Sequence, residues 1–330
     1  MKEKVLITGA SGFIGYHLIE AALRRGLAVC AGVRKGSDIS HLKVFDITYC
    51  TLDYANQNVL AKQLADAGCR YIVHAAGATR AATQQAYDTI NAQYTYNLAA
   101  AAVEALGDQL VSFALVSSLA AIGPLNDHHT VIDETAAPAP VTAYGRSKLL
   151  AEQKLQDVAG LPWLVLRPTA VYGPRERDIF IMLRSVSRGI EPYIGRKIQQ
   201  LSFVYVKDLA SVIINALFAG VTHETFNISD GNSYDQYALA DLSKQILHRK
   251  TWRLHLPYGM INSLAVALEK IHGWRGSTPV LNREKLQELT ALNWVCDISK
   301  AKNKLGYKPT YTLERGLTET LQWYQLYKWL

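Results

Sequence analysis

The sequence predicts an α/β protein built on a doubly wound parallel sheet, followed by a smaller C-terminal domain. Three observations point to this fold. Short apolar runs alternate with longer helix-like segments through the first half of the 330-residue chain. A glycine-rich turn follows directly after the first apolar run, and the composition changes after Pro168. Strands separated by helices indicate βαβ units, which form parallel sheets.

The first half of the chain supplies the elements of that sheet. We expect strands at about 5–8, 28–33, 49–52, 71–75, 111–117 and 163–166, and helices at about 13–25, 55–67, 87–106 and 143–156. A doubly wound sheet binds its ligands at the carboxyl ends of its strands. Residues that directly follow these strands are therefore the first candidates for a functional site.

The domain boundary is expected near residue 170. Beyond Pro168, Pro and Gly residues separate short elements and aromatic residues become frequent. We expect residues 1–170 to form the sheet domain and residues 171–330 to form mainly a substrate-binding domain. Segments near 203–229 are candidates to return to the sheet, because they are again apolar and strand-like or helix-like.

The composition excludes several classes of protein. Hydrophobic residues make up 49% and charged residues 19%, which is typical of a globular chain. No uninterrupted apolar run is long enough for a membrane span, and residues 1–4 leave no room for a signal peptide, so we expect a cytoplasmic protein. The net charge of +7 is dispersed without a basic run, which argues against a nucleic-acid partner. The four cysteines form no Cys-x-x-Cys pair and no histidines cluster, so we expect free thiols and no metal site.

The glycine-rich turn Thr8-Gly9-Ala10-Ser11-Gly12-Phe13-Ile14-Gly15 predicts a dinucleotide site. Gly9 permits a tight turn, Gly12 leaves room for a pyrophosphate, and Gly15 lets the following helix pack on the strand. The N–H groups at the start of that helix are free to bind phosphate.

The end of the second strand bears on the choice of cofactor. A carboxylate there would bind a free ribose 2′-hydroxyl, but this chain has Arg34 and Lys35 instead. Arg34 could bind a 2′-phosphate, so we favour NADP(H) over NAD(H). Asp53, after the third strand, is either a contact to the adenine or the N-cap of the next helix.

Tyr144 and Lys148 form the second chemical motif. They are four residues apart on a predicted helix and so share one face. An ammonium close to a phenol favours the phenolate, which would let Tyr144 act as a general acid or base. Ser118, at the end of the fifth strand, could hydrogen-bond the reacting oxygen and position it.

With these two motifs and several others in a fixed order, the chain resembles a known family. The further segments are HAAG at 74–77, Asn91, SSLAAIG at 117–123, LRPTAVYGP at 166–174, FVYVKDLA at 203–210, FNIS at 226–229 and DISKAKNKLGYKP at 297–309. The resemblance is to the extended short-chain dehydrogenase/reductases, also called the NAD-dependent epimerase/dehydratase family, and it covers nearly the whole chain.

The resemblance implies a Rossmann fold, an NAD(P) cofactor, a small-molecule substrate and a homodimer formed through helices near 97–105 and 144–156. It implies that Ser118, Tyr144 and Lys148 are the catalytic residues, that Asn91 supports a proton relay, and that Arg167 begins the loop towards the substrate domain. The cofactor contacts that we infer are Gly9, Ser11, Gly12, Phe13, Ile14, Gly15, Arg34, Leu52, Asp53, Ala75, Ala76, Gly77, Asn91, Lys148 and Arg167.

Departures from the family pattern bear on the reaction. Leu119 and Ala120 occupy positions where dehydratases of this family carry acidic residues, and neither can do acid–base work. Ala170 stands where sugar-nucleotide enzymes often have Asn. We therefore favour an oxidoreductase acting on a secondary alcohol or ketone, nearer the hydroxysteroid dehydrogenase and dihydroflavonol reductase branches.

Three further interpretations stay open. Apolar residues of the later chain are either a substrate pocket or simply the core of the small domain; they are Phe180, Met182, Tyr193, Phe203 and Tyr205. A nucleotide-sugar epimerase is the alternative function, since Arg175, Arg177 and Arg283 could hold a diphosphate. A non-catalytic nucleotide-binding protein is the second alternative.

Overall fold

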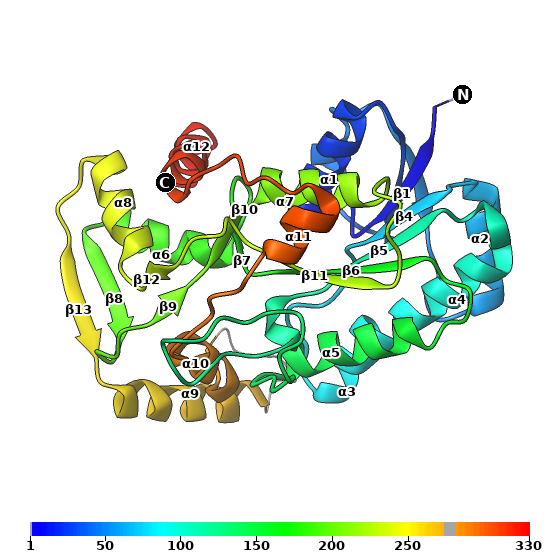
Figure 1. The fold of residues 1–330 in the computed structure, drawn as a ribbon. Helices are drawn as coiled ribbons and strands as arrows, with labels where there is room; N and C mark the ends of the chain where they lie inside the picture. The colour runs from blue at the N-terminus through cyan, green and yellow to red at the C-terminus, as the bar shows by residue number, and fades with distance from the viewer. Residues whose placement is uncertain (1, 274–280) are drawn as a thin grey trace.

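The fold prediction is confirmed by the computed structural model, which describes residues 2–273 and 281–330. A seven-stranded parallel sheet has the strand order β11-β6-β5-β4-β1-β2-β3 (Figure 1). The order reverses between β1 and β4, which is the arrangement of a Rossmann-type sheet. The carboxyl ends of β1, β4 and β5 therefore lie next to one another.

The elements of the first half follow the predicted order closely. The strands are β1 (Lys4–Thr8), β2 (Ala28–Val33), β3 (Thr48–Thr51), β4 (Tyr71–His74), β5 (Ser112–Val116) and β6 (Trp163–Pro168), and the helices are α1 (Phe13–Arg24), α2 (Gln57–Ala67), α3 (Gln84–Tyr87), α4 (Tyr94–Leu106) and α5 (Ala143–Gln156). The helix predicted over 87–106 is interrupted by a π-helical turn, η2 (Asp88–Gln93), which contains Asn91. Such turns often occur at functional sites.

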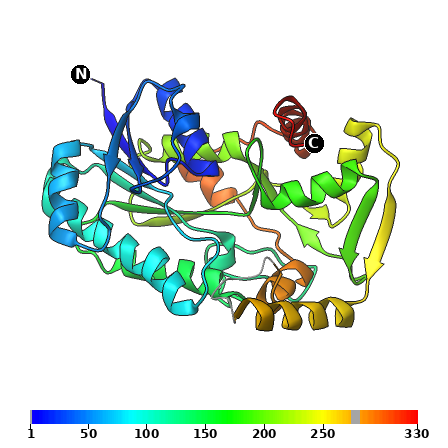
Figure 2. The same cartoon turned by 180° about the vertical axis from the view of Figure 1, so that it is seen from behind.

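Helices cover both faces of the sheet (Figures 1 and 2). Alternate residues of each strand point to opposite faces, so β1 buries Val5 and Ile7 in one core and Leu6 in the other. The first core is shared with α1 and α7 (Val206–Ala216), and the second with α2, α4 and α5. Each βαβ unit therefore contributes to a continuous packed layer on its own side.

After β6 the chain leaves the sheet and then re-enters it. Strand β11 (Glu224–Ile228) pairs in parallel with β6 and forms the edge of the sheet. The remaining elements are η1 (Ser40–Leu42), η3 (Gly107–Gln109), η4 (Leu119–Ala121), β7 (Ala170–Tyr172), α6 (Asp178–Ser187), β8 (Ile190–Ile194), β9 (Gln200–Leu201), β10 (Phe203–Tyr205), β12 (Tyr234–Asp235), α8 (Ala238–Leu247), β13 (Trp252–Leu256), α9 (Tyr258–Gly273), α10 (Arg283–Thr290), α11 (Ser299–Leu305) and α12 (Leu313–Leu326).

A third core lies outside the sheet, between α6, α8, β7, β10 and α12. It buries Tyr172, Phe203 and Tyr205 and holds Phe180 and Met182 at its margin. Of the five apolar residues considered as pocket candidates, Phe203 and Tyr205 are therefore core residues, and Phe180 and Met182 pack against the same core. The fifth, Tyr193, lies on β8 beside Glu191.

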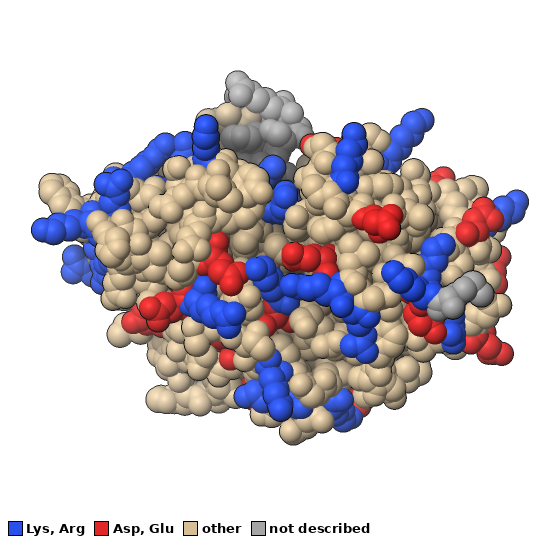
Figure 3. Space-filling model, turned by 90° about the horizontal axis from the view of Figure 1, so that it is seen from above, with Lys and Arg blue, Asp and Glu red and all other residues tan. Residues whose placement is uncertain are grey.

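The surface carries mixed charge. On the face seen in Figure 3, Lys and Arg side chains alternate with Asp and Glu side chains across the middle. The ion pairs of the protein include Lys207–Glu319, with a distance of 2.6 Å between Nζ and Oε2. In the described part of the chain no helix is long and apolar enough to span a bilayer, and the four cysteines are free, as predicted.

Candidate functional site

The β1–α1 turn is packed so tightly that two of its glycines are required by the protein itself. Gly9 has a φ of +66°, and a Cβ there would lie 2.7 Å from the backbone of Ala75. A Cβ at Gly15 would lie 2.1 Å from the carbonyl oxygen of Gly9. Both positions therefore exclude any side chain, because the turn lies against the end of β4 and against the first turn of α1.

Gly12 is different, because a Cβ there would approach only the Gly9 carbonyl oxygen, at 3.2 Å. Gly12 is the N-cap of α1 and offers no side-chain cap. The N–H groups of the first helical turn, including those of Phe13 and Ile14, have no acceptor within the helix. This end of α1 therefore combines a residue without a side chain with free N–H donors.

The three predicted catalytic residues lie on two adjacent elements. Ser118 follows β5 and is the N-cap of η4, with its Oγ accepting from the N–H of Ala120 at 3.2 Å. Tyr144 and Lys148 lie on α5, whose N-cap is Thr142. A Cβ at Gly145 would lie 2.3 Å from the Ala120 carbonyl oxygen, so α5 begins in direct contact with η4. That contact brings Tyr144 close enough to Ser118 for the Ser118 side chain to lower the pKa of Tyr144.

Burial dominates the titration of this pair. It raises the pKa of Tyr144 to about 12, although the Ser118 side chain lowers it. Burial also lowers the pKa of Lys148 to about 8, against the opposing charge of Glu152. Lys148 Nζ donates to the Val116 carbonyl oxygen at 2.6 Å. In this structure Tyr144 is therefore a protonated acid at neutral pH, and the lowering of its pKa by Lys148 that the sequence suggests is not the dominant effect.

A buried ion pair lies beneath the site. Arg167, at the end of β6, binds Glu152 of α5 through Nε and Nη2, with Nη2 to Oε2 at 2.6 Å. Ser117 also donates to Glu152. Arg167 is 7% exposed, and its Nη1 is buried without a partner among the described residues. The structure thus places Arg167 as an anchor of α5, a role that sequence reasoning missed because the two residues are fifteen positions apart on different elements.

Asn91 joins the π-helical turn to the strand ends. Its Oδ1 accepts from the N–H of Ala78 at 2.7 Å, and its Nδ2 donates to Ser147 Oγ at 2.9 Å. Ser147 in turn donates to the Tyr144 carbonyl oxygen at 2.7 Å. A Cβ at Gly77 would lie 3.0 Å from Asn91 Oδ1, which explains the glycine at that position.

His74 is a structural residue at the end of β4. Its ring nitrogens contact Thr8 Oγ1 at 2.7 Å and Thr95 Oγ1 at 2.9 Å. Burial lowers the pKa of His74 to about 3, and the charge of Lys148 adds to that shift. The neutral ring therefore ties β1, β4 and α4 together, and Ala76 joins the same network by donating its N–H to Thr8 Oγ1 at 3.2 Å.

The residues expected around the adenosine occupy the ends of β2 and β3. Arg34 is exposed directly after β2, and Leu52 is buried in the core after β3. Asp53 Oδ1 accepts from the N–H of Ala55 at 3.1 Å. The N-cap of α2 is Asn56, which accepts from Val59 N–H at 3.2 Å. The alternative in which Asp53 caps α2 is wrong, because the helix begins three residues later.

The structure adds a basic group beside the glycine turn. Arg175 has a φ of +79°, and its guanidinium lies 4.0 Å from the centre of the Tyr16 ring on α1. His41 stacks on the same ring. The three arginines considered as a diphosphate clamp have different partners, since Arg177 lies over Trp329 and Arg283 pairs with Glu269.

Comparisons with known proteins agree with this geometry. The NAD dependent epimerase/dehydratase family matches residues 5–229. The chain is 28% identical to N-acetyl-α-D-glucosaminyl-diphospho-ditrans,octacis-undecaprenol 4-epimerase of Escherichia coli O157:H7, over 98% of this chain and 96% of that protein. It is 26% identical to UDP-glucose 4-epimerase of Vibrio cholerae, over 98% and 95% of the two chains.

One further relative and one solved structure are also similar to this chain. Sterol-4-α-carboxylate 3-dehydrogenase (decarboxylating) of Candida albicans is 26% identical, over 97% of each chain. The crystal structure of UDP-glucose 4-epimerase with UDP-glucose from Thermotoga maritima has a TM-score of 0.79 at 22% identity, covering 98% of this chain and 99% of that one, which shows the shared fold. By its motifs, its sheet order and the match over two thirds of its length, this chain belongs to the NAD-dependent epimerase/dehydratase family of enzymes.

Proposed function

We propose that Tyr144, Ser118 and Lys148 move a proton to or from the oxygen of a secondary alcohol or ketone substrate, while the carbinol carbon gains or loses a hydride. The observation that carries this proposal is the close contact of α5 with η4, which brings Tyr144, Ser118 and the buried Lys148 together at the carboxyl ends of the strands. A phenol and a hydroxyl that are held close together can share the oxygen of a secondary alcohol or ketone. Residues 171–330 would contribute most of the substrate contacts.

The glycine turn fits a nicotinamide dinucleotide. Gly12 is only mildly constrained by its own backbone, so the close approach of a pyrophosphate gives it a function. The cofactor, when bound, supplies the hydride acceptor or donor. The protein supplies the donors of the first turn of α1 and, at the adenosine end, the exposed guanidinium of Arg34.

The proton step follows from the pKa values. Tyr144 is protonated at neutral pH and can give its Oη proton to an alkoxide that forms on a bound ketone. Ser118 Oγ would hold the same oxygen, which restrains it at the phenol. Lys148, charged below a pKa of about 8, would stabilise the phenolate that remains, and Glu152 helps it keep that charge.

A sugar joined to a diphosphate is the substrate class that the relatives favour. Two of the three relatives compared above by sequence are 4-epimerases of such sugars, one with a nucleotide and one with a polyprenol as the carrier. These relatives support the epimerase alternative over the reductase that the sequence first favoured. In an epimerase Tyr144 would have to start the cycle as the phenolate, which the charge of Lys148 favours, and would then accept and return a proton within one catalytic cycle.

A dehydrogenase or reductase for a less polar alcohol is the second candidate, and particular residues favour it. Leu119 and Ala120 present no polar group after Ser118, and Ala170 is exposed where an amide would bind a diphosphate. Arg34 with no acid beside it favours NADP(H), and one relative is named as a dehydrogenase of a sterol carboxylate.

The nucleotide that the purified protein carries distinguishes the two candidates. We would denature the protein and identify the released nucleotide by mass spectrometry. Near-stoichiometric NAD⁺ supports the epimerase, because an enzyme that regains its oxidation state each cycle has no need to exchange the cofactor. Empty protein, or a small amount of NADP(H), supports the reductase, and turnover of neither diphospho-sugars nor ketones would contradict both.

A further inference from the structure

The two-stranded ribbon of β8 and β13 turns its polar residues towards the protein and its apolar residues outwards, which is the reverse of an ordinary surface ribbon. The strands pair in parallel, with Ile190 opposite Trp252 and Glu191 opposite Arg253. Directly paired residues share a face, and successive residues alternate between faces. One face of the ribbon therefore carries Glu191, Tyr193, Arg253 and His255, and the other carries only apolar residues.

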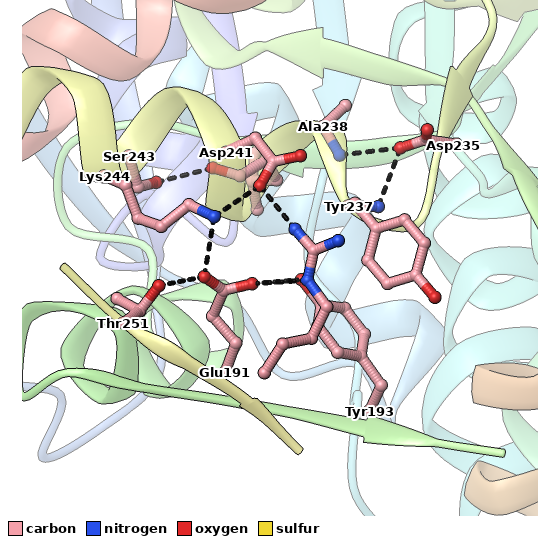
Figure 4. Close-up of polar contacts among 11 residues, drawn as sticks. Glu191, Tyr193, Asp235, Tyr237, Ala238, Asp241, Ser243, Lys244 and Thr251 are labelled. Carbon is pink, nitrogen blue, oxygen red and sulfur yellow. Dashed lines mark hydrogen bonds and ion pairs between the residues drawn. The ribbon is translucent and has the colours of Figure 1, made fainter. Parts of the chain in front are cut away.

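The polar face packs against α8, and Glu191 is its buried centre. Glu191 is 1% exposed and receives Lys244 Nζ at 2.9 Å and Arg253 Nε at 3.1 Å. Figure 4 shows its carboxylate between Thr251 and Lys244, with Tyr193 beside it and Asp241 of α8 above. Burial would raise the pKa of Glu191, but bonds from Thr251, Lys244 and Arg253 bring it to about 2. The inner face is thus a fully paired ionic cluster that fixes the ribbon on α8.

The apolar face is the exposed one. Trp252 is 80% exposed, Ile190 45% and Leu254 44%. Pro192, Ile194 and Leu256 complete this face. A ribbon that pays for burying charge on one side while leaving a tryptophan in water on the other is unusual, because apolar surface is costly to expose. The exposed face is therefore a candidate for binding a lipid surface or another protein molecule.

Helix α9 continues this apolar surface. It starts two residues after β13, as Figures 1 and 2 show. Met260, Leu264 and Ile271 are 52%, 48% and 51% exposed, and their spacing places them along one side of the helix. A second apolar stripe, with Ile261 and Ala265 buried, holds α9 on the protein. The helix is thus apolar on both its inner and its outer side.

Cations surround this surface. Six Lys and Arg residues of the segments that form it are exposed and join no ion pair within the described residues: Arg188, Arg196, Lys197, Arg249, Lys250 and Lys270. The two carboxylates in these segments, Glu191 and Glu269, are each paired with cations.

We propose that the apolar face of β8 and β13, together with the outer side of α9, docks this protein on an anionic lipid surface. Apolar side chains with an aromatic residue would enter the boundary of the bilayer, while the surrounding cations would contact the headgroups. Unpaired cations around an apolar centre match a negatively charged interface and would repel a second copy of the same face.

Docking at this face would place the bilayer close to the catalytic end of α5. Helix α9 contacts α10 through the Glu269–Arg283 pair, at 2.9 Å. Glu284 of α10 accepts from the N–H of Ala143, at 2.6 Å, directly before Tyr144. The docking face is thus one helix away from the proposed catalytic residue. The inference concerns the surface alone and does not depend on which substrate class is correct.

Vesicle binding tests the proposal. The full-length protein would be sedimented with vesicles of phosphatidylcholine alone and of phosphatidylcholine with about 30 mol% phosphatidylglycerol. We expect binding to be about tenfold tighter on the anionic vesicles and to weaken with added salt. The double variant Trp252→Ser/Leu264→Ser should lose about tenfold in binding, and so should Arg249→Glu/Lys250→Glu.

Matched variants control for charge, apolarity and folding. Val59→Ser/Val131→Ser removes exposed apolar residues elsewhere, and Lys62→Glu/Lys302→Glu reverses exposed charges elsewhere. Both should bind vesicles like the parent, and all four variants should retain its circular dichroism and melting temperature.

Binding to neither vesicle, equal binding to both, or equal loss in the control variants would overturn the proposal. A different result would assign the face to a second copy of the chain. In that case the protein would not bind vesicles, light scattering would show that it self-associates, and Trp252→Ser/Leu264→Ser would abolish the self-association. Because the nucleotide released on denaturation is measured separately, failure here leaves the proposed reaction untouched.

Discussion

Tyr144 and Lys148 have pKa values that burial moves in opposite directions, to about 12 and about 8. The phenol therefore keeps its proton over the physiological range, whereas the ammonium loses its charge as the pH rises past 8. A protonated phenol beside a charged lysine is the form suited to protonating an alkoxide. We accordingly expect turnover in the reductive direction to decline above about pH 8.

Tyr144→Phe tests the acid directly. The variant removes one hydroxyl and keeps the ring, which packs edge-to-face with Tyr87 at a centroid distance of 6.3 Å. Loss of general acid catalysis should lower kcat by roughly 10²–10⁴-fold. Nucleotide binding should stay as in the parent. Steady-state kinetics measures kcat, and nucleotide titration measures binding separately. Tyr87→Phe is the matched control, and a Tyr144→Phe enzyme with the parent's kcat would exclude the assigned role.

His74 makes stability depend on pH. Its folded-state pKa is about 3 and its unfolded value about 6.5, so the unfolded chain binds the extra proton between these values. The contribution of His74 to the free energy of unfolding is therefore fully present above pH 6.5 and falls as the pH decreases towards 3. At pH 5 the loss from this group is about 2 kcal/mol. Urea unfolding at pH 7.5 and pH 5 should show a smaller difference in His74→Gln than in the parent or in His129→Gln, an exposed control.

Helix α5 is the element that organises the site. Tyr144, Lys148 and Glu152 occur at four-residue intervals and so lie on one side of the helix, facing the ends of β5 and β6. Gly145 allows its first turn to touch η4, and Glu152 anchors its third turn through Arg167 and Ser117. Two separate contacts thus fix the direction of the helix that carries the phenol.

Glu152→Gln should weaken the attachment of α5 to Arg167 and should lower the pKa of Lys148. Removing one partner of a buried ion pair leaves Arg167 charged without compensation, which costs about 3–5 kcal/mol. The loss of a nearby negative charge should also lower the pKa of Lys148 and shift the alkaline limb of the activity profile to lower pH. Urea unfolding and a kcat–pH profile check the two effects, with Glu104→Gln on the exposed side of α4 as the control. An unchanged profile would mean that Glu152 is structural alone.

At the scale of the whole molecule, the C-terminal segment closes back on the sheet domain. Asp208 of α7 is 6% exposed, and its Oδ2 accepts from the N–H groups of Thr310 and Tyr311, each at 2.9 Å. Helix α12 then buries Tyr324, whose hydroxyl donates to the Glu176 carbonyl oxygen at 2.7 Å. Residues more than a hundred positions apart thus hold the two parts of the chain together.

Asp208→Ala should loosen this closure. Two backbone N–H groups and the Thr310 hydroxyl lose a charged acceptor, which should reduce the free energy of unfolding by about 3 kcal/mol. Limited proteolysis should then cut near residues 306–312 faster than in the parent. Asp133→Ala, which alters only a local turn, should leave both measurements unchanged. Equal cleavage rates in the two variants would contradict this account of the tail.

Local patterns were enough to predict the sheet, the glycine turn and the helix that carries Tyr144 and Lys148. The apolar run at 5–8, the glycines at 9, 12 and 15, and the four-residue interval on α5 depend on neighbours in the chain. Such short-range features follow from backbone sterics and helical periodicity. The strand ends were predicted within one or two residues for the same reason.

The tertiary structure decided what depends on distant contacts. Asp53 is separated from the helix that it was expected to cap, because Asn56 begins that helix. Arg167 pairs with Glu152, Arg175 lies on Tyr16, and the ribbon of β8 and β13 turns its charged residues inward. No local pattern reveals these partners, since a buried charge is stable only where the fold supplies its counterpart. By itself the sequence determined the sheet and the catalytic motif; only the packing of remote segments determined the anchor of α5 and the face that is left exposed.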